Sequence, residues 1–260
     1  PGDYTKLDTL ANMVQNGTIH ILCVTETKLD IFALQEALTT IRRRGLRATC
    51  TLHCETKRQG AMIVWNPATI GMEVGRHWID KDSRIVTQRF HTKGCTLTVC
   101  SAYLESNTLP SETKARFYDN IRARVPPTDD GRHMFLAMGD FNAVTERETQ
   151  RIPVPKKEKN AHLLKFQHDN SLTEVVSARH PPGTKMYTRS QINIKGELTK
   201  SKIDHGFCNE ALLLCTPQAG WIETNPFITS DHGWIWCSVD MEAVSNVAPV
   251  AQEAAVRRAN

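Results

Sequence analysis

The chain of 260 residues is long enough for one large α/β domain or two small ones, and its 40% hydrophobic and 23% charged residues are typical of a globular protein. A net charge of +4 permits a polyanionic partner but does not require one. We find no signal peptide and no apolar stretch of about 20 residues, which predicts an intracellular protein and excludes a membrane-spanning helix.

The N-terminal part of the chain predicts two helices separated by a strand. Apolar residues recur three and four positions apart over 6–16, the pattern of an amphipathic helix, and a glycine follows it. A buried strand over 18–27 comes next. A second helix, with apolar residues spaced from Ile31 to Ile41, is predicted to stop near Gly45.

The middle of the chain predicts strands in succession. Runs rich in β-branched residues at 60–66, 83–91 and 95–104 are separated by turn-forming residues. Ser111 is expected to cap a helix over 112–125, which two prolines close. The remaining predicted elements are a strand at 133–139, a helix near 158–169, a strand pair of 185–191 with 200–208 around Gly196, and a last strand at 233–241.

This order of elements predicts a fold class. Strands occur in runs without a helix between them, which argues against a strictly alternating barrel and favours two packed mixed sheets with helices on their outer faces. We assign residues 1–241 to this domain and interpret 242–260, rich in Ala, Val and Glu, as a linker or tail toward a downstream region. Because the first residue is Pro1, we expect a piece of a longer polypeptide.

The eight cysteines favour reduced thiols over a metal cluster. Cys23, Cys100 and Cys237 lie within apolar runs, where a free thiol behaves as a small buried hydrophobic residue. The stretch 50–54, CTLHC, is the nearest approach to a zinc site, but no second pair of ligands has suitable spacing.

The stretch 134–143, MFLAMGDFNA, ends an apolar run with an acid, an aromatic and an amide. Side chains alternate along extended backbone, so Asp140 and Asn142 can share one face while Phe141 anchors in the other. Such a pair could bind a metal, a water or a phosphate. It could equally form a plain turn, for which Gly, Asp and Asn are the usual residues.

Other predicted strands also end in polar side chains. In α/β architectures, groups at strand ends converge over one rim of the sheet, where acids can bind a hard cation and a histidine beside an acid can carry a proton or clamp a phosphate. The remaining residues of this kind are Glu26, Tyr103, Asp204, Asp231 and His232.

Each of these residues also has an ordinary structural explanation. The alternatives are a solvated strand end for Glu26, a core aromatic for Tyr103, an ion pair of Asp204 with Lys202 or Lys200, and a helix cap or turn for Asp231 and His232. The order and spacing of the whole set favour a site.

That ordered set resembles the motifs of the endonuclease/exonuclease/phosphatase superfamily, and within it the apurinic-type endonuclease domain of non-LTR (LINE-like) retrotransposons. The resemblance spans about residues 6–241, and its motifs are specific as a combination although each is common alone. They are VTETK (24–28), SAYLESN (101–107), GDFNA (139–143), SKIDH (201–205) and TSDHGWI (229–235).

The resemblance implies a four-layered α/β sandwich, a catalytic Mg²⁺ or Mn²⁺ ion and a role for each residue of the set. By position, Glu26 would bind the metal with help from Asp231, and Tyr103 would contact the scissile phosphate. Asp140 would orient or deprotonate the attacking water, and Asn142 would hydrogen-bond the phosphate or that water. His232 would contact the phosphoryl oxygen, and Asp204 would orient His232.

The chain departs from the family pattern in two places. The segment MYT (186–188) resembles an aromatic-Thr motif that a tryptophan usually follows, but Arg189 stands there. Members of the family also open with a strand whose asparagine supports the metal-binding glutamate. No such strand precedes Glu26 here, so we expect an unpaired sheet edge and a metal site without one supporting partner.

The resemblance implies a Mg²⁺-dependent endonuclease that nicks duplex target DNA and leaves a 3′-hydroxyl primer for a reverse transcriptase encoded downstream, with action in the nucleus. Two alternatives remain. One is another phosphodiesterase of the same superfamily, acting on RNA or a phosphoinositide. The other is a degenerate copy that binds DNA without cutting it, which the missing opening strand would favour.

Overall fold

A computed structural model describes most of the chain, so His53 and Cys54 of the CTLHC stretch and most of the expected tail lie outside the described residues. The described ranges are 4–52, 59–92, 94–105, 109–126, 132–154, 160–223 and 230–244. The helices within them are α1 (Tyr4–Gln15), α2 (Ile31–Arg43), α3 (Ser111–Arg122), α4 (Arg147–Gln150), α5 (Ala161–Asp169), α6 (Val175–Ala178) and α7 (Glu210–Leu214).

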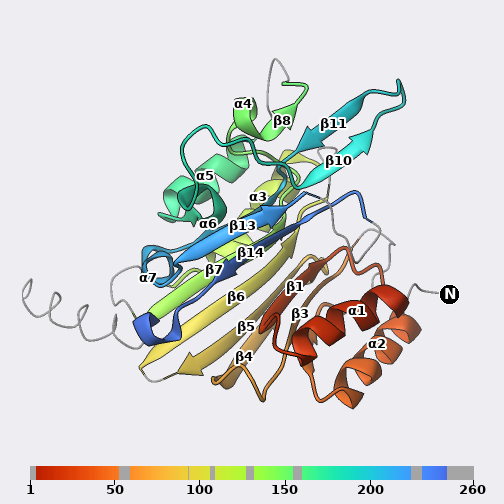
Figure 1. Cartoon of the computed structure of the whole chain (residues 1–260), viewed down its shortest axis with the longest axis vertical. Coiled ribbons are helices and arrows are strands. Elements are labelled where there is room, and N and C mark those ends of the chain that lie inside the picture. The colour runs from red at the N-terminus through yellow and green to blue at the C-terminus, as the bar shows by residue number, and fades with distance from the viewer. Residues whose placement is uncertain are drawn as a thin grey trace, which may run out of the picture.

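Within these described ranges, the strands form one large sheet and three smaller ones (Figure 1). The large sheet has the order β4-β5-β6-β7-β12-β9. Adjacent strands within it are antiparallel, except for the parallel pair β6 and β7. The others have the orders β1-β3-β2, β13-β14 and β10-β11-β8. The strand bounds are β1 (Ile21–Thr25), β2 (Arg47–Cys50), β3 (Ala61–Trp65), β4 (Glu73–Ile79), β5 (Ile85–Thr92), β6 (Cys95–Tyr103), β7 (His133–Asp140), β8 (Arg151–Ile152), β9 (Thr173–Glu174), β10 (Arg189–Ile192), β11 (Leu198–Ser201), β12 (Asp204–Cys208), β13 (Gln218–Ile222) and β14 (Trp234–Ser238).

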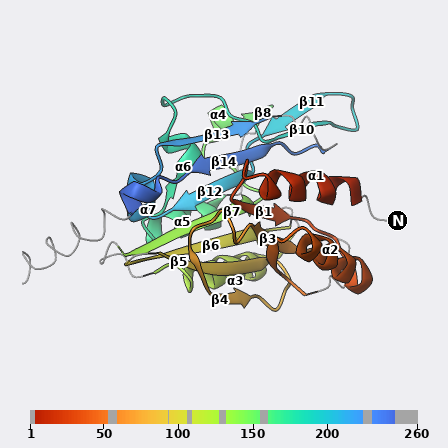
Figure 2. The same cartoon turned by 60° about the horizontal axis from the view of Figure 1, so that its bottom comes forward.

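Alternating apolar side chains divide the interior into three cores. In β7, Met134 and Leu136 pack into the core between the sheets, whereas Phe135 packs beneath α3 and α5. In β3, Ile63 faces the inter-sheet core, whereas Val64 packs beneath α1 and α2. Successive residues on a strand point to opposite faces, so strands apolar at every position must be covered on both sides. Helices therefore cover the outer faces of two packed sheets (Figure 2).

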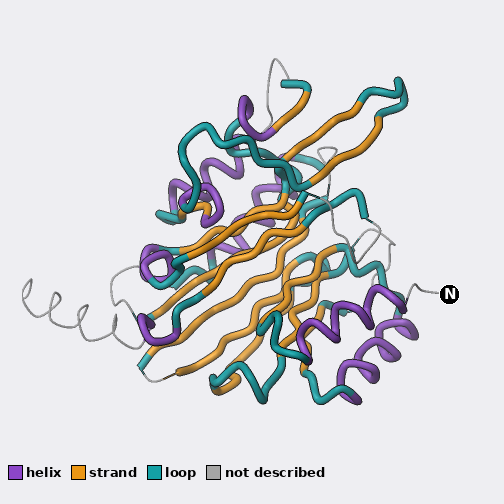
Figure 3. Tube along the Cα trace, viewed as in Figure 1, coloured by secondary structure: helices purple, strands orange, loops and turns teal. Residues whose placement is uncertain are grey.

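The predicted architecture of two packed mixed sheets flanked by helices is confirmed. A hairpin around Gly196 is found as predicted, but its strands are β10 and β11 rather than 185–191 and 200–208; the two pair in antiparallel register and project beyond the large sheet (Figure 3). β12 belongs to the large sheet instead, where it pairs with β7. Within the described residues, β1 and β14 each pair with a strand on one side only.

Some local predictions were wrong or incomplete. Ser111 does not cap α3: the cap residue is Pro110, without a side-chain hydrogen bond, and the Ser111 hydroxyl lies 2.8 Å from His162 Nε2 instead. The strands β2, β4 and β13 were not predicted, because they are short or lie at sheet edges and lack an apolar run. No helix in the described part of the chain has the length and apolar character needed to cross a membrane.

Candidate functional site

Three predicted site residues lie in register at one edge of the large sheet. Tyr103 ends β6 and is paired with Asp140 at the end of β7, and Asp204 at the start of β12 is paired with the same Asp140. Because β6 and β7 are parallel and β12 runs antiparallel to them, the end of the first two and the beginning of the third share this edge. Sheet pairing alone therefore brings a phenol and two carboxyl groups together.

Gly139 permits this close register. It has φ of +151°, and a Cβ built on it would lie 1.9 Å from the carbonyl oxygen of Ala102 on β6. No side chain fits at such a distance, so the residue before Asp140 must be glycine. The position of Asp140 depends on this contact between the backbones of β6 and β7.

The loop after β7 uses Phe141 as an anchor and Asn142 as a support for Asp140. Phe141 is fully buried beneath α3 and α5. Asn142 has φ of +47°, and its N–H donates to Asp140 Oδ1 at 2.8 Å. Its amide nitrogen donates to Asp140 Oδ2 at 3.1 Å and to the carbonyl of Leu104 at 2.7 Å. The Asn142 side chain thus holds the Asp140 carboxyl group.

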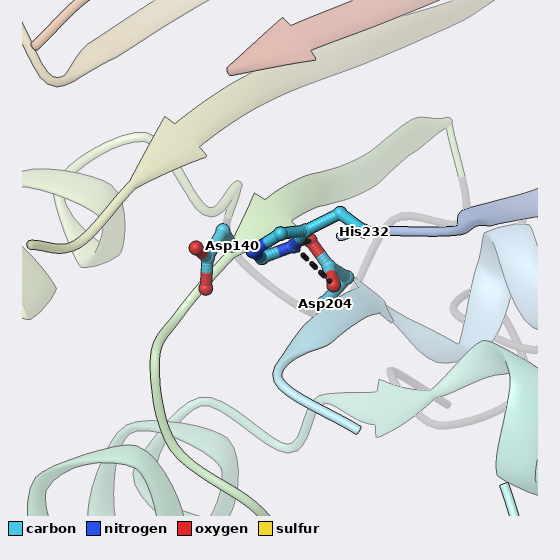
Figure 4. A group of neighbouring side chains, drawn as sticks. All are labelled: Asp140, Asp204 and His232. Atoms are coloured by element: carbon cyan, nitrogen blue, oxygen red, sulfur yellow. Dashed lines mark hydrogen bonds and ion pairs between the residues drawn. The ribbon is translucent and has the colours of Figure 1, made fainter. Parts of the chain in front are cut away.

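His232 reaches the same edge from the segment before β14 (Figure 4). Its Nδ1 lies 3.1 Å from Asp204 Oδ2 and 3.3 Å from Oδ1. Burial lowers the pKa of His232, but the hydrogen bond and charge of Asp204 outweigh burial and raise the pKa to about 9. The imidazole is therefore protonated at neutral pH, and its Nδ1–H donates a hydrogen bond to the Asp204 carboxylate.

Asp140 is the most deeply buried acid of the site, with 2% of its surface exposed. Burial and the nearby charge of Asp204 raise its pKa, and the positive charge of His232 opposes this effect. A carboxylate with a raised pKa is a stronger proton acceptor than one in water. Asp140 therefore has the chemistry of a general base.

Glu26 joins the site from a different sheet. It follows β1 directly, with φ of +52°, and hydrogen-bonds to Tyr103. Burial raises the pKa of Glu26, but hydrogen bonds from Lys28 and Tyr103 outweigh it and keep the pKa below its ordinary value. Burial and Glu26 both raise the pKa of Tyr103, so its hydroxyl stays protonated.

Asp231 lies next to His232 but is turned toward a different partner. Its Oδ2 accepts a hydrogen bond from Arg189 Nε at 2.9 Å, and its side chain is half-exposed. Burial raises the pKa of Asp231, but the hydrogen bond and charge of Arg189 together with the charge of His232 lower it overall. The structure thus brings Glu26, Tyr103, Asp140, Asn142, Asp204 and His232 together, with Asp231 paired at their margin.

The donor set fits a hard divalent cation at Glu26 better than at His232. Atoms of Asp140, Asp204 and His232 lie within 4.8 Å of one another, which is close enough to share an ion. A protonated imidazole has no lone pair to give, however. Glu26 offers carboxylate oxygens, which Mg²⁺ prefers, and already holds a cation, because Lys28 Nζ lies 2.6 Å from Glu26 Oε2.

Three further residues contact this set and were not among the predicted site residues. Lys28 and Arg189 form ion pairs with Glu26 and Asp231, and Thr188 bonds the backbone of Asp204. Lys28 and Thr188 stand within the VTETK and MYT stretches, but only the folded chain shows which carboxylate or amide each contacts.

The arrangement of strands and helices is shared with known nucleases. The structure is similar to an AP endonuclease from Leishmania major, with a TM-score of 0.70 and 15% identity over 88% of this chain and 81% of that one. The likeness shows that this chain shares its fold with that nuclease.

The same fold is found in two further solved structures. An AP endonuclease from Archaeoglobus fulgidus has a TM-score of 0.70 and 15% identity over 91% of this chain and 95% of that one. The endonuclease domain of TRAS1, a telomere-specific non-LTR retrotransposon, has a TM-score of 0.57 and 16% identity over 85% of this chain and 98% of that one. No protein-family model and no curated protein sequence matches the chain.

Proposed function

We propose that this chain is a Mg²⁺- or Mn²⁺-dependent DNA endonuclease of the kind that non-LTR retrotransposons encode. The observation that supports it is the meeting of Asp140, Asp204 and His232 with Glu26 and Tyr103 at one edge of a nuclease fold. A phosphodiester is anionic and resists attack, so cleavage needs positive charge near a non-bridging oxygen and a base for water.

Each residue has a chemical role in this proposal. Glu26 would hold the cation, with Asp231 contributing after release from Arg189, and the ion would neutralise charge on the phosphate. Asp140 would accept the proton of the attacking water, with its carboxyl group oriented by Asn142. The donors to the phosphate would be the His232 ring and, after its release from Glu26, the protonated Tyr103 hydroxyl.

The Asp204–His232 pair would act where negative charge grows. His232 Nδ1 is bonded to Asp204, so the other ring nitrogen is left to face the phosphoryl oxygen. The charge of Asp204 keeps the ring protonated, and its fixed position removes the need to reorient the ring during the reaction. Loss of such a donor typically lowers the rate on the order of 10²-fold or more.

The product of the proposed reaction would be a nick with a 3′-hydroxyl end. A nick with a 3′-hydroxyl end can prime reverse transcription by a polymerase domain in the same polypeptide, acting on nuclear target DNA. The likeness in fold to the TRAS1 endonuclease domain motivates this assignment. Extension of the nicked strand by a DNA polymerase, without prior phosphatase treatment, tests the 3′ end directly, because a 3′-phosphate would block extension.

Nicking of a supercoiled plasmid with Mg²⁺, with and without EDTA, tests the catalytic proposal. We expect metal-dependent nicking that falls at least about 100-fold in Asp140→Ala and in His232→Ala. The matched controls are Asp119→Ala and His168→Ala, exposed residues of α3 and α5 that should leave nicking unchanged. Unchanged cutting by the first two variants would refute the site, and DNA binding without nicking would favour a non-catalytic DNA-binding module.

A further inference from the structure

Thr188 connects the two segments that carry Asp204 and His232. It is fully buried, immediately before β10. Its hydroxyl oxygen accepts hydrogen bonds from the backbone N–H groups of Ile203 at 3.2 Å and Asp204 at 3.1 Å. Its carbonyl oxygen accepts the N–H of Gly233, the neighbour of His232, at 2.6 Å. One residue thus bonds to the backbone on both sides of the Asp204–His232 contact.

The Thr188 hydroxyl accepts two backbone hydrogen bonds that the path of the chain would otherwise leave without an acceptor. β11 ends at Ser201 and β12 begins at Asp204, so the chain leaves one sheet and enters another within two residues. The N–H groups of Ile203 and Asp204 are both buried in this crossing. A hydroxyl oxygen has two lone pairs and can accept both hydrogen bonds, whereas a methyl group could accept neither.

The two connections made by Thr188 differ in how they depend on its side chain. The bond to Gly233 comes from the main-chain carbonyl, which every residue at position 188 would retain. The bonds to Ile203 and Asp204 come from the hydroxyl alone. Removal of the hydroxyl therefore releases the Asp204 side of the contact while the His232 side stays attached.

We propose that Thr188 is a positioning residue, whose hydroxyl fixes the start of β12 so that the Asp204 carboxylate meets the His232 ring. This proposal deepens the proposed endonuclease function and rests on it for its catalytic consequence. Thr188 acts through the backbone of Asp204, whose carboxylate lies 3.1 Å from His232 Nδ1. Buried donors without a partner move to find one, and a small shift at Asp204 lengthens that contact.

The positioning effect can be measured without any activity. Thr188→Val has nearly the same shape but no hydroxyl, and Thr188→Ser keeps the hydroxyl. In proton NMR spectra of the chain, we expect the hydrogen-bonded Nδ1–H of His232 to give a downfield signal in the wild type and in Thr188→Ser. The signal should move upfield or disappear in Thr188→Val, as in Asp204→Asn, which assigns it. An identical signal in Thr188→Val would overturn the proposal.

The catalytic consequence is measured by single-turnover nicking. Displacement of a catalytic group by about 1 Å can cost about 100-fold, so we expect Thr188→Val to lower the rate constant about 10- to 100-fold at unchanged KM. Thr188→Ser should restore most of the rate. In a His232→Ala background, Thr188→Val should cause no further loss, because both changes disable the same contact.

The outcomes separate the two proposals. Independent losses in the double variant would show that Thr188 does not act through His232. If the wild type cuts no DNA, the proposed function fails, and the NMR comparison still decides whether the Thr188 hydroxyl positions Asp204. If Thr188→Val does not fold, Thr188→Ala, which also lacks the hydroxyl, gives the same comparison.

Discussion

Two histidines, one on β12 and one beside it, have pKa values shifted in opposite directions although each lies near a carboxylate. At the sheet edge, His232 bonds to Asp204 and its pKa is raised to about 9. One residue along β12 from Asp204, on the opposite face, His205 lies near Glu174, and burial lowers its pKa to about 4. A histidine next to an acid is thus protonated in one place and neutral in the other.

Burial and a competing cation explain this difference. His205 is fully buried, whereas the His232 side chain is 24% exposed. His205 Nδ1 lies 4.0 Å from Glu174 Oε1, beyond hydrogen-bond range, and the charge of Glu174 is already neutralised by the ammonium group of Lys202. The neutral His205 ring instead donates from Nε2 to the carbonyl of Ala143 at 2.8 Å.

The two groups around these histidines therefore differ: the group at the sheet edge keeps a charged ring, whereas the buried group links parts of the fold. In the buried group of Glu174, Lys202 and His205, the pKa values of Glu174 and His205 lie well below neutral pH, and hydrogen bonds of the group join β9, β12 and the loop after Asn142. The group at the edge retains a charged ring beside solvent. The first is expected to dominate stability and the second to dominate chemistry.

The largest expected effect on stability is that of Lys202→Met. It leaves the charge of Glu174 buried without its partner, which typically costs about 3–5 kcal/mol. Urea unfolding measures the loss. The matched control is Lys200→Met, because Lys200 forms a partly exposed pair with Glu223 at 2.7 Å that should contribute about 1 kcal/mol or less.

Adding Glu174→Gln to Lys202→Met should recover part of the loss, since the unpaired charge is then removed. Equal effects of the two lysine substitutions would contradict the distinction between the buried and the exposed pair.

The next effect is a pH dependence of stability that His205 causes. The folded-state pKa of about 4 lies below the ordinary 6.5, so the unfolded chain takes up the proton first. The stabilising contribution of the neutral His205 ring is therefore fully present above pH 6.5 and is lost as the pH falls toward 4. Between pH 6.5 and 5 we expect protonation of His205 in the unfolded chain to lower the free energy of unfolding by about 2 kcal/mol.

Urea unfolding of the wild type and of His205→Phe across this range measures that contribution. The charged groups facing His205 are Glu174, Lys202 and Asp204. Burial raises the pKa of Glu174, but Lys202 outweighs it and lowers the pKa to about 2, so Glu174 does not titrate within this range. If the free energy of unfolding falls equally with pH in the two proteins, His205 does not titrate as inferred.

The edge of the site could be read largely from the sequence, whereas the group behind it could not. Apolar runs that end in Asp140 or near Tyr103 give both the strands and the polar residues at their ends, and strand pairing brings those ends together. Alternation also placed Phe141 correctly in a core. These signals are local, so a single sequence is enough to find them.

The partners of charged side chains depend on contacts between distant parts of the chain. Lys202 was a possible partner of Asp204, but it is fully buried and bonds to Glu174, 28 residues earlier. Nothing in the residues around Lys202 distinguishes it from the partly exposed Lys200. For the same reason, the pairing of Asp231 with Arg189 and the contact of Thr188 with Asp204 were not predicted.

The smallest expected effect on stability is that of Asp204→Asn. His232 has a folded-state pKa above its unfolded value, so its stabilising contribution is present below pH 6.5 and is lost as the pH rises through about 9. Removal of the Asp204 charge cancels this contribution but also relieves its repulsion of Asp140. We therefore expect a net loss of only about 1 kcal/mol at pH 7, well below that of Lys202→Met.

Urea unfolding of Asp204→Asn and an NMR titration of His232 in the same variant test this expectation. The pKa of His232 should fall below about 9, because burial then acts without the opposing negative charge of Asp204. A loss as large as that of Lys202→Met would place the Asp204–His232 pair among the structural contacts of the fold. A small loss with a large fall in nicking rate would instead show that this pair maintains a charged ring for the reaction while the buried group behind it maintains the fold.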